Sequence, residues 1–170
     1  MGSAGSRPFH GHDHDHAGCV EAALGDAERL CAGRGVRLTK LRRRVLECVW
    51  RSHAPVGAYE VLDALGTESR RAAPPTVYRA LAFLMEQGLV HRLESRNAYI
   101  GCAMPAAPHS GQFLICRDCG SVGEVADPAI TQTVARRTEE LGFSLHGQTI
   151  ELTGLCPQCR ETPPAARDGR

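Results

Sequence analysis

The sequence predicts an α+β protein of two small domains, and three observations lead to this class. Apolar residues recur at helical spacing in several short segments between residues 20 and 87, which predicts a group of short helices. Residues 101–111 then contain two prolines and show no regular period, as a hinge would. Beyond them, short strand-like segments flank one further helical pattern, so the second domain is expected to be α/β.

Four helices are expected in the first domain. The first covers residues 20–31. The second begins after Thr39, whose hydroxyl can accept a hydrogen bond from the first turn, and the third ends at Gly66. The fourth covers residues 75–87, with a proline in its first turn and Gly88 as its C-terminal cap. Its apolar stripe is expected to be buried and consists of Val77, Ala80, Leu81 and Leu84.

A two-stranded ribbon is expected over residues 89–101, turning at positions 95–97. Short helices followed by a hairpin are the pattern of a winged helix-turn-helix, in which the helix 75–87 would enter the major groove of DNA. The charge distribution agrees, because residues 29–96 carry thirteen Lys and Arg against six Asp and Glu, a net charge of +7. Such a block favours a polyanionic partner, although a solvated basic surface is the alternative.

The second domain is expected to contain strands at residues 112–116, 121–125 and 148–155. Between the last two strands lies a helical pattern in which Asp127 caps the first turn. The apolar residues of this helix are expected to face inward, and they are Ile130, Val134 and Leu141.

Two Cys-x-x-Cys pairs, Cys116/Cys119 and Cys156/Cys159, are separated by thirty-six residues in this second domain. Four thiolates suit a closed, tetrahedral structural zinc site. A redox pair is the alternative, but it needs only one such motif, usually at the head of a helix that lowers the pKa of one thiol. Inert cysteines are a third reading. The N-terminus lacks the apolar stretch of a secretory signal, which favours the cytoplasm, where cysteines stay reduced.

Four more potential ligands gather around the hinge in the sequence, namely His91, Cys102, His109 and Glu124. Two imidazoles, a thiolate and a carboxylate form a suitable four-coordinate shell for a divalent cation. These residues come from both domains, so filling the site would fix one domain relative to the other. The alternative is that these residues bind no metal. The two histidines would then be exposed or hydrogen-bonded, Cys102 would be a small buried apolar side chain and Glu124 a surface carboxylate.

The remaining histidines and cysteines receive simpler interpretations. Cys31 and Cys48 fall on apolar helical faces and are expected in the core. Cys19 is assigned to a flexible arm, and His146 is expected to be exposed. The arm contains the stretch HGHDHDH at residues 10–16, which either captures metal loosely or is a solvated tail, native or artificial.

Several segments, in order, resemble the ferric uptake regulator superfamily of bacterial metal-responsive repressors: LTKLRRRVLECV, GAYEVLDAL, PPTVYRALAFLMEQGLVHRLES, FLICRDCG and GLCPQC. The resemblance runs from about residue 20 to residue 160. It is strongest to the zinc uptake regulator branch, because of the PPTVYRAL stretch and the hinge cysteine. It implies a homodimer whose winged helices bind a palindromic, AT-rich operator and whose C-terminal domains pair through a shared sheet.

Residue by residue, the resemblance implies two zinc ions per chain. Cys116, Cys119, Cys156 and Cys159 would hold the structural ion, and His91, Cys102, His109 and Glu124 the regulatory ion. Tyr59 and Arg79 match positions that read bases, although helix packing and a phosphate contact are their respective alternatives. Three further residues are expected to position the DNA backbone: Thr76, Tyr78 and Arg42. The chain lacks the His-rich cluster of the iron-responsive type ahead of its first cysteine pair.

The expected organisation is therefore a disordered His-rich arm (1–18), a winged-helix DNA-binding domain (19–100), a hinge (101–110), a dimerisation domain with the four-cysteine zinc (111–160) and a disordered tail (161–170). The expected function is a cytoplasmic, zinc-responsive transcriptional repressor of zinc uptake genes. An iron-, manganese- or peroxide-responsive sibling, a zinc-storage or metal-delivery protein and a thiol oxidoreductase remain alternatives. No paired carboxylates, nucleophile elbow or phosphate loop indicate an enzyme with a small-molecule substrate, and no apolar run predicts a membrane span.

Overall fold

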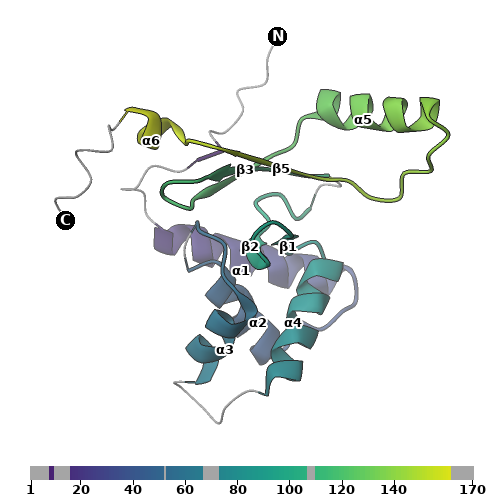
Figure 1. The fold of residues 1–170 in the computed structure, drawn as a ribbon. Coiled ribbons are helices and arrows are strands. Elements are labelled where there is room, and N and C mark those ends of the chain that lie inside the picture. Colours follow the sequence, from purple (N-terminus) through teal and green to yellow (C-terminus); the bar gives the residue numbers. More distant parts are fainter. Residues whose placement is uncertain (1–7, 10–15, 52, 67–72, 107–109, 162–170) are drawn as a thin grey trace. The chain divides into compact units, whose positions relative to one another are not determined.

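A computed structural model describes residues 8–9, 16–51, 53–66, 73–106 and 110–161 (Figure 1). The chain divides into two compact units. We call residues 12–107 the helical unit, and residues 1–11 together with 108–170 the sheet unit. Both combine helices with small sheets, so the expected α+β class is confirmed. None of the helices in the described ranges has the length and hydropathy that crossing a bilayer requires.

The helical unit begins with α1 (His16–Gly33) and continues with α2 (Lys40–Val49), α3 (Ala58–Gly66) and α4 (Pro74–Glu86). Helix α1 starts earlier than the apolar pattern predicts, so the expectation of disorder was wrong for residues 16–18. Likewise Cys19 lies in α1 and not in a flexible arm. A helix anchored by buried side chains can extend through polar residues, because each added residue gains one backbone hydrogen bond.

The local signals for α2 and α4 are confirmed. The Thr39 hydroxyl accepts a hydrogen bond from the backbone N–H of Arg42 at 3.3 Å. After α4 the chain turns at Gly88, whose φ of +67° lies in the left-handed region that glycine adopts without strain. The four residues of the expected α4 stripe are buried.

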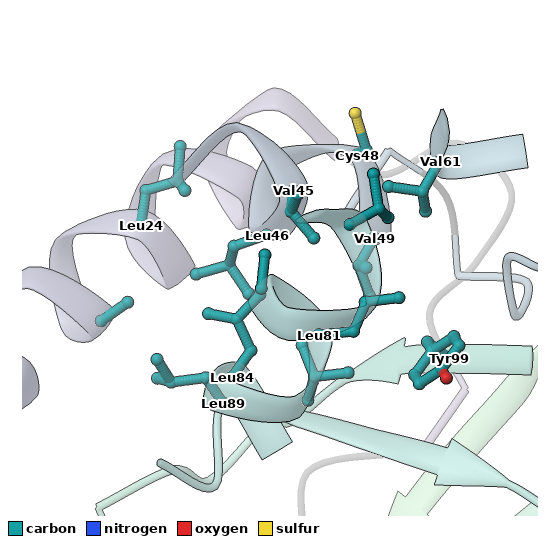
Figure 2. Packing of buried hydrophobic residues seen from close by; sticks show 14 of the residues in the cluster. Leu24, Val45, Leu46, Cys48, Val49, Val61, Leu81, Leu84, Leu89 and Tyr99 are labelled. Atoms are coloured by element: carbon teal, nitrogen blue, oxygen red, sulfur yellow. The ribbon is translucent and has the colours of Figure 1, made fainter. Parts of the chain in front are cut away.

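The core of the helical unit forms where α1, α2, α3 and α4 turn their apolar faces together (Figure 2). Leu46, Leu81 and Leu84 are at most 1% exposed. Cys31 and Cys48 are buried in the same cluster, as expected. Burial raises the pKa of the Cys31 thiol, more strongly than Arg34 and Arg42 lower it. A buried, neutral thiol behaves as a small apolar side chain, which agrees with a packing role.

A hairpin of β1 (Val90–Leu93) and β2 (Ala98–Gly101) completes the helical unit. The strands are antiparallel, with His91 opposite Ile100. The turn between them includes Asn97, at a φ of 46°. Val56, just ahead of α3, exchanges two backbone hydrogen bonds with Tyr99 on β2, at 2.9 and 2.8 Å. The hairpin is thereby attached to the segment that leads into α3.

The sheet unit contains a three-stranded sheet in the order β4-β3-β5. Central β3 (Gly111–Cys116) pairs antiparallel with β4 (Val122–Val125) and parallel with β5 (Thr149–Gly154). Helix α5 (Pro128–Glu140) forms the crossover between β4 and β5, and α6 (Pro157–Glu161) follows the last strand. The Asp127 side chain accepts a hydrogen bond from the N–H of Ala129 at 2.8 Å, which confirms the predicted cap.

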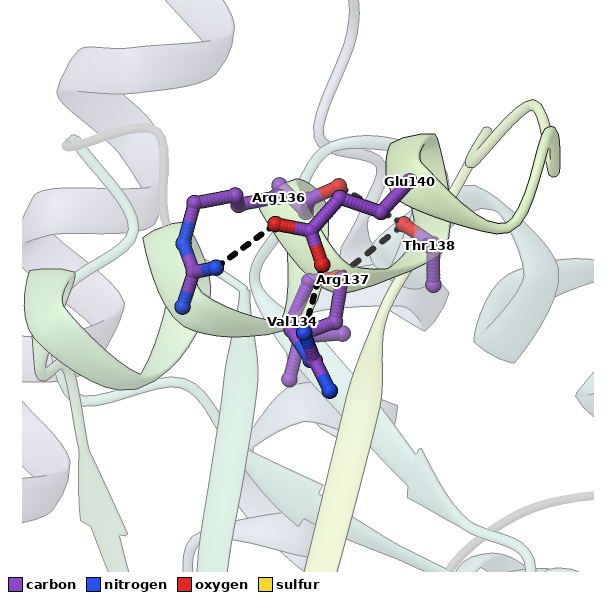
Figure 3. Close-up of polar contacts among 6 residues, drawn as sticks. Val134, Arg136, Arg137, Thr138 and Glu140 are labelled. Carbon is purple, nitrogen blue, oxygen red and sulfur yellow. Dashed lines mark hydrogen bonds and ion pairs between the residues drawn. The ribbon is translucent and has the colours of Figure 1, made fainter.

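The inward orientation predicted for the apolar residues of α5 was wrong for the single chain. Helix α5 has no buried residue; Ile130 is exposed, Val134 is half-buried and the side chain of Leu141 is 84% exposed. On the polar side of α5, Arg136 and Arg137 both pair with Glu140, at 2.7 and 2.6 Å, and the Thr138 hydroxyl donates to the carbonyl of Val134 (Figure 3). Periodicity finds an apolar stripe, but it does not say which surface covers that stripe.

Candidate metal centres and nucleic-acid surface

Four cysteines converge at one end of the sheet unit. Cys116 ends β3 and Cys119 lies in the turn that follows, while Cys156 lies between β5 and α6 and Cys159 lies on α6. Their sulfur atoms all lie within 4.8 Å of one another. The sulfurs of Cys119 and Cys156 are 3.8 Å apart. A tetrahedral zinc with Zn–S bonds of about 2.3 Å places neighbouring sulfurs about 3.8 Å apart, so this set fits zinc.

Backbone geometry directs N–H groups at these sulfurs. The N–H of Cys156 donates to the sulfur of Cys116 at 3.4 Å, and the N–H of Cys159 donates to the sulfur of Cys156 at 3.4 Å. Gly120, at a φ of +75°, lets the first turn close, with its N–H 3.1 Å from the carbonyl oxygen of Cys116. Donors aimed at sulfur stabilise the thiolate form that binds metal.

The pKa values of two of these thiols are shifted in opposite directions. Burial raises the pKa of Cys116, but hydrogen bonds from the backbone of Cys156, Cys119 and Asp118 outweigh that effect and lower it to about 6. Burial, together with hydrogen bonds to the neighbouring thiols, raises the pKa of Cys159 to about 12. Four thiolates this close repel one another, and a dication among them removes the penalty.

The arrangement favours a metal over a redox pair. The first pair begins at the end of β3 and not at the head of a helix, which is the usual place of a redox pair. The second pair does lie at the start of α6, but that helix has only five residues. Both pairs also share one centre, which a redox motif does not require. Phe9 packs against the buried cysteines Cys116, Cys156 and Cys159, so the expected disorder of the arm was wrong for this residue as well.

Two of the four hinge-site candidates lie in the helical unit. His91 is half-buried on β1, and Cys102 is buried directly after β2. Their potential ligand atoms lie within 4.8 Å of each other. The N–H of Cys102 donates to the carbonyl of Leu89 at 3.0 Å, which fixes the backbone where the hairpin ends. Glu124 is half-buried on β4 of the sheet unit, and His109 lies outside the described residues.

The residues expected to contact DNA lie on three helices of the helical unit. Tyr59 on α3 is 69% exposed and Tyr78 on α4 is 45% exposed, so both rings are available to a partner. Thr76 and Arg79 are exposed in the first half of α4. Arg42 differs, because its guanidinium lies 3.5 Å from the centre of the Phe83 ring and donates to the carbonyl of Arg37 at 2.6 Å. If Arg42 contacts the DNA backbone as expected, it must do so while it keeps, or after it gives up, its contacts with Phe83 and Arg37.

The structure also groups three residues that the sequence interpretation missed: His16, Cys19 and His53. A His and a Cys three positions apart are a helical signal for neighbouring ligands. The signal is easily overlooked in the sequence, because His16 lies in the segment predicted to be disordered (1–18) and Cys19 directly follows it. His146, as predicted, is exposed.

Comparisons with known proteins agree with these features. A model of the ferric uptake regulator family matches residues 33–153. The chain is 41% identical over 143 residues to the zinc uptake regulation protein of Escherichia coli (strain K12), which covers 84% of each protein. It is 32% identical over 129 residues to the zinc uptake regulation protein of Mycobacterium tuberculosis (strain ATCC 25618 / H37Rv), covering 74% of this chain and 96% of that protein.

Solved structures of zinc uptake regulators also resemble this chain. A zinc uptake regulator complexed with zinc and DNA superposes with a TM-score of 0.79 at 40% identity, covering 84% of this chain and 95% of the other. The crystal structure of holo XcZur superposes with a TM-score of 0.77 at 44% identity, covering 83% of this chain and 99% of the other.

Proposed function

Because the chain belongs to the ferric uptake regulator family, we propose that it is a zinc-responsive transcriptional repressor that binds operator DNA and controls zinc uptake genes. The observation that carries this proposal is 41% identity to a zinc uptake regulation protein over 84% of both chains. Similarity to a regulator complexed with zinc and DNA supports the two binding partners, since it extends over 95% of that protein.

The helical unit is the DNA-binding part of this proposal. Helices α2, α3 and α4 with the β1–β2 hairpin would form a winged helix-turn-helix, with α4 as the helix that enters the major groove. Tyr59 and Arg79 would contact base edges, the arginine through its two-pronged guanidinium. Thr76, Tyr78 and Arg42 would hold the phosphate backbone and so set the register of α4. The exposure of both tyrosines supports these roles.

The four-cysteine cluster would hold a structural zinc ion in the sheet unit. Its sulfur spacing and backbone donors support that assignment. When bound, the ion would neutralise the thiolates and join the end of β3 to the segment after β5. Cys116, Cys119, Cys156 and Cys159 would thereby close a small core that has few buried apolar side chains.

A second, regulatory zinc would be held by His91, Cys102, His109 and Glu124. The soft thiolate of Cys102 with two imidazoles favours zinc over manganese or iron(II). Since the ligands belong to both units, filling the site would select relative positions of the units that match DNA half-sites. Zinc binding and operator binding would then be linked, each tightening the other by the same factor. Allosteric coupling of about 1–3 kcal/mol corresponds to a roughly 5- to 150-fold change in affinity.

The sheet unit would also form the homodimer. Its large exposed apolar residues, among those that the structure describes, lie on α5, on β5, in the segment between them and directly after β5: Ile130, Leu141, Phe143, Leu145, Leu152 and Leu155. Among the described strands, β5 lies at the edge of the sheet and pairs on one side only, with β3. A second copy that covered this surface would bury the stripe of α5 that the single chain leaves exposed.

The decisive experiment measures binding of a fluorescent operator fragment by anisotropy, at fixed salt, across buffered free zinc, with manganese and iron(II) as controls. Protein that holds only the structural zinc should bind weakly, and a second zinc per chain should raise affinity at least fivefold. Cys102→Ser should keep the fold and lose this response, while Cys116→Ser should lose the fold of the sheet unit. Affinity that is flat across zinc, or that rises with iron or manganese instead, would reject a zinc sensor.

A further inference from the structure

We propose that His16, Cys19 and His53 form an additional metal site within the helical unit, and that it takes a divalent transition-metal ion such as zinc. The site is separate from the four-cysteine cluster and shares no ligand with the proposed regulatory site. It requires only residues of the helical unit, so it does not depend on the proposed function.

The three side chains already have the spacing of a metal shell. One ligand atom from each lies within 4.8 Å of the other two. Nδ1 of His16 is 3.1 Å from Nε2 of His53, and the two rings meet edge to face, with centroids 4.5 Å apart and an interplanar angle of 65°. Two imidazole nitrogens on tetrahedral zinc, with bonds of about 2.0–2.1 Å, lie roughly 3.3–3.4 Å apart. The observed separation therefore needs only a small adjustment to admit an ion.

Two separately anchored backbone segments bring these residues together. His16 and Cys19 lie one turn apart on the same face of α1, which Leu24, Ala27 and Cys31 fix in the core further along the helix. His53 lies between α2 and α3, three residues before Val56, whose two hydrogen bonds to Tyr99 hold that segment. The segments are positioned by the fold, so an ion would find ligands that are largely preorganised.

The surroundings of the cluster are intermediate between surface and core. All three residues are half-buried, and Nε2 of His16 is shielded from solvent. An ion could therefore reach the site and yet lose part of its hydration there. Two imidazoles and a thiolate favour zinc, cobalt(II), nickel(II) or copper over magnesium or manganese, and three protein ligands leave the fourth tetrahedral position to water.

A hydrogen bond between the two histidines is the competing explanation. A neutral N–H···N pair also fits a separation of 3.1 Å. That pair does not need Cys19, whose sulfur nevertheless lies within the same 4.8 Å limit. Participation of Cys19 in metal binding therefore separates the two explanations.

Occupancy would have a local structural consequence. It would tie the first turn of α1 to the segment that leads into α3, the helix that carries the exposed Tyr59. An ion there would therefore stabilise the start of α1 and hold the approach to α3 in the arrangement described here.

The test uses full-length protein in which Cys102→Ser removes the proposed regulatory site and the four cysteines keep their zinc. Replacing His10, His12 and His14 with alanine in the same chain removes loose capture by the arm. Cobalt(II) is then titrated while thiolate-to-cobalt charge-transfer absorption is recorded, and bound metal per chain is counted by native mass spectrometry. We expect one additional cobalt per chain with a thiolate signal.

Two variants locate the ion. Cys19→Ser should abolish the thiolate signal, and His53→Gln should weaken cobalt binding at least about tenfold, since even outer-shell partners are worth about 10–100-fold. The matched control His146→Gln, at an exposed histidine of the sheet unit, should change neither. Unchanged circular dichroism of the metal-free variants checks that they fold. Absence of the additional cobalt, or a thiolate signal that survives Cys19→Ser, would overturn the site and leave the histidine hydrogen bond.

Discussion

Gly101 is the position where one added methyl group should disturb the hairpin most directly. Gly101 ends β2, and a Cβ atom placed there would overlap the indole of Trp50, with the Trp50 Cζ2 atom only 2.7 Å away. Trp50 follows α2 and packs at the edge of the helical core. Gly101→Ala should therefore force either the indole or the end of β2 to move.

Two opposing effects set the size of this change. Overpacking a well-packed site costs about 1–3 kcal/mol. Replacing glycine by alanine stabilises a compatible backbone by about 0.4–1 kcal/mol through the unfolded chain. The clash should dominate in the native background. With Trp50→Ala in place the clash disappears and only the favourable effect remains, so the two substitutions should be coupled by at least about 1 kcal/mol, within the range for residues in contact.

Urea denaturation of the wild type, both single variants and the double variant measures this coupling as differences in the free energy of unfolding. Gly101→Ala should destabilise alone and be neutral or stabilising beside Trp50→Ala. Because Cys102 follows Gly101 directly, the single variant should also need more free zinc for operator binding. An equal effect of Gly101→Ala in both backgrounds would show that the indole moves aside without cost and would refute the reasoning.

Three further outcomes are expected. Leu84→Ala, at a fully buried position, should cost about 2–5 kcal/mol in urea denaturation, whereas Ala82→Ser on the exposed side of α4 should change little. Arg79→Ala should weaken operator binding and relax base preference at one position; a uniform loss with a salt slope reduced by about 1 would instead mark a phosphate contact. Leu152→Glu on edge strand β5 should shift sedimentation toward the monomer, and a persistent dimer would place the interface elsewhere.

The helices of the helical unit were predictable because their signals are local. Apolar spacing, the Thr39 cap and Gly88 act within a few residues, and the structure has each of them where expected. The convergence of the cysteine pairs was predictable for a chemical reason, since four thiols at that spacing share a ligand preference. Neither inference required knowledge of how distant segments pair.

What could not be predicted depends on contacts between distant segments. The pairing of β5 beside β3, parallel and at an edge, follows from the crossover through α5 and leaves no local signal. The stripe of α5 was visible in the sequence, but its exposure in one chain was not. His53 lies 37 residues from His16, and only the packing of α1 beside the segment after α2 brings them together.

The sheet unit shows why its proposed zinc and its proposed partner chain would act together. Among its described residues, the buried large apolar side chains that are not cysteine are Phe113, Ile115 and Val122. A core this small is weak, and domains of this kind often need a metal ion or a partner chain to be stable. Zinc at the cysteines would close the sheet at one end, and a second copy over α5 and β5 would cover the apolar surface left exposed. The stability of the unit should therefore fall both on chelation of zinc and on dilution of the protein, and each loss should make the other more severe.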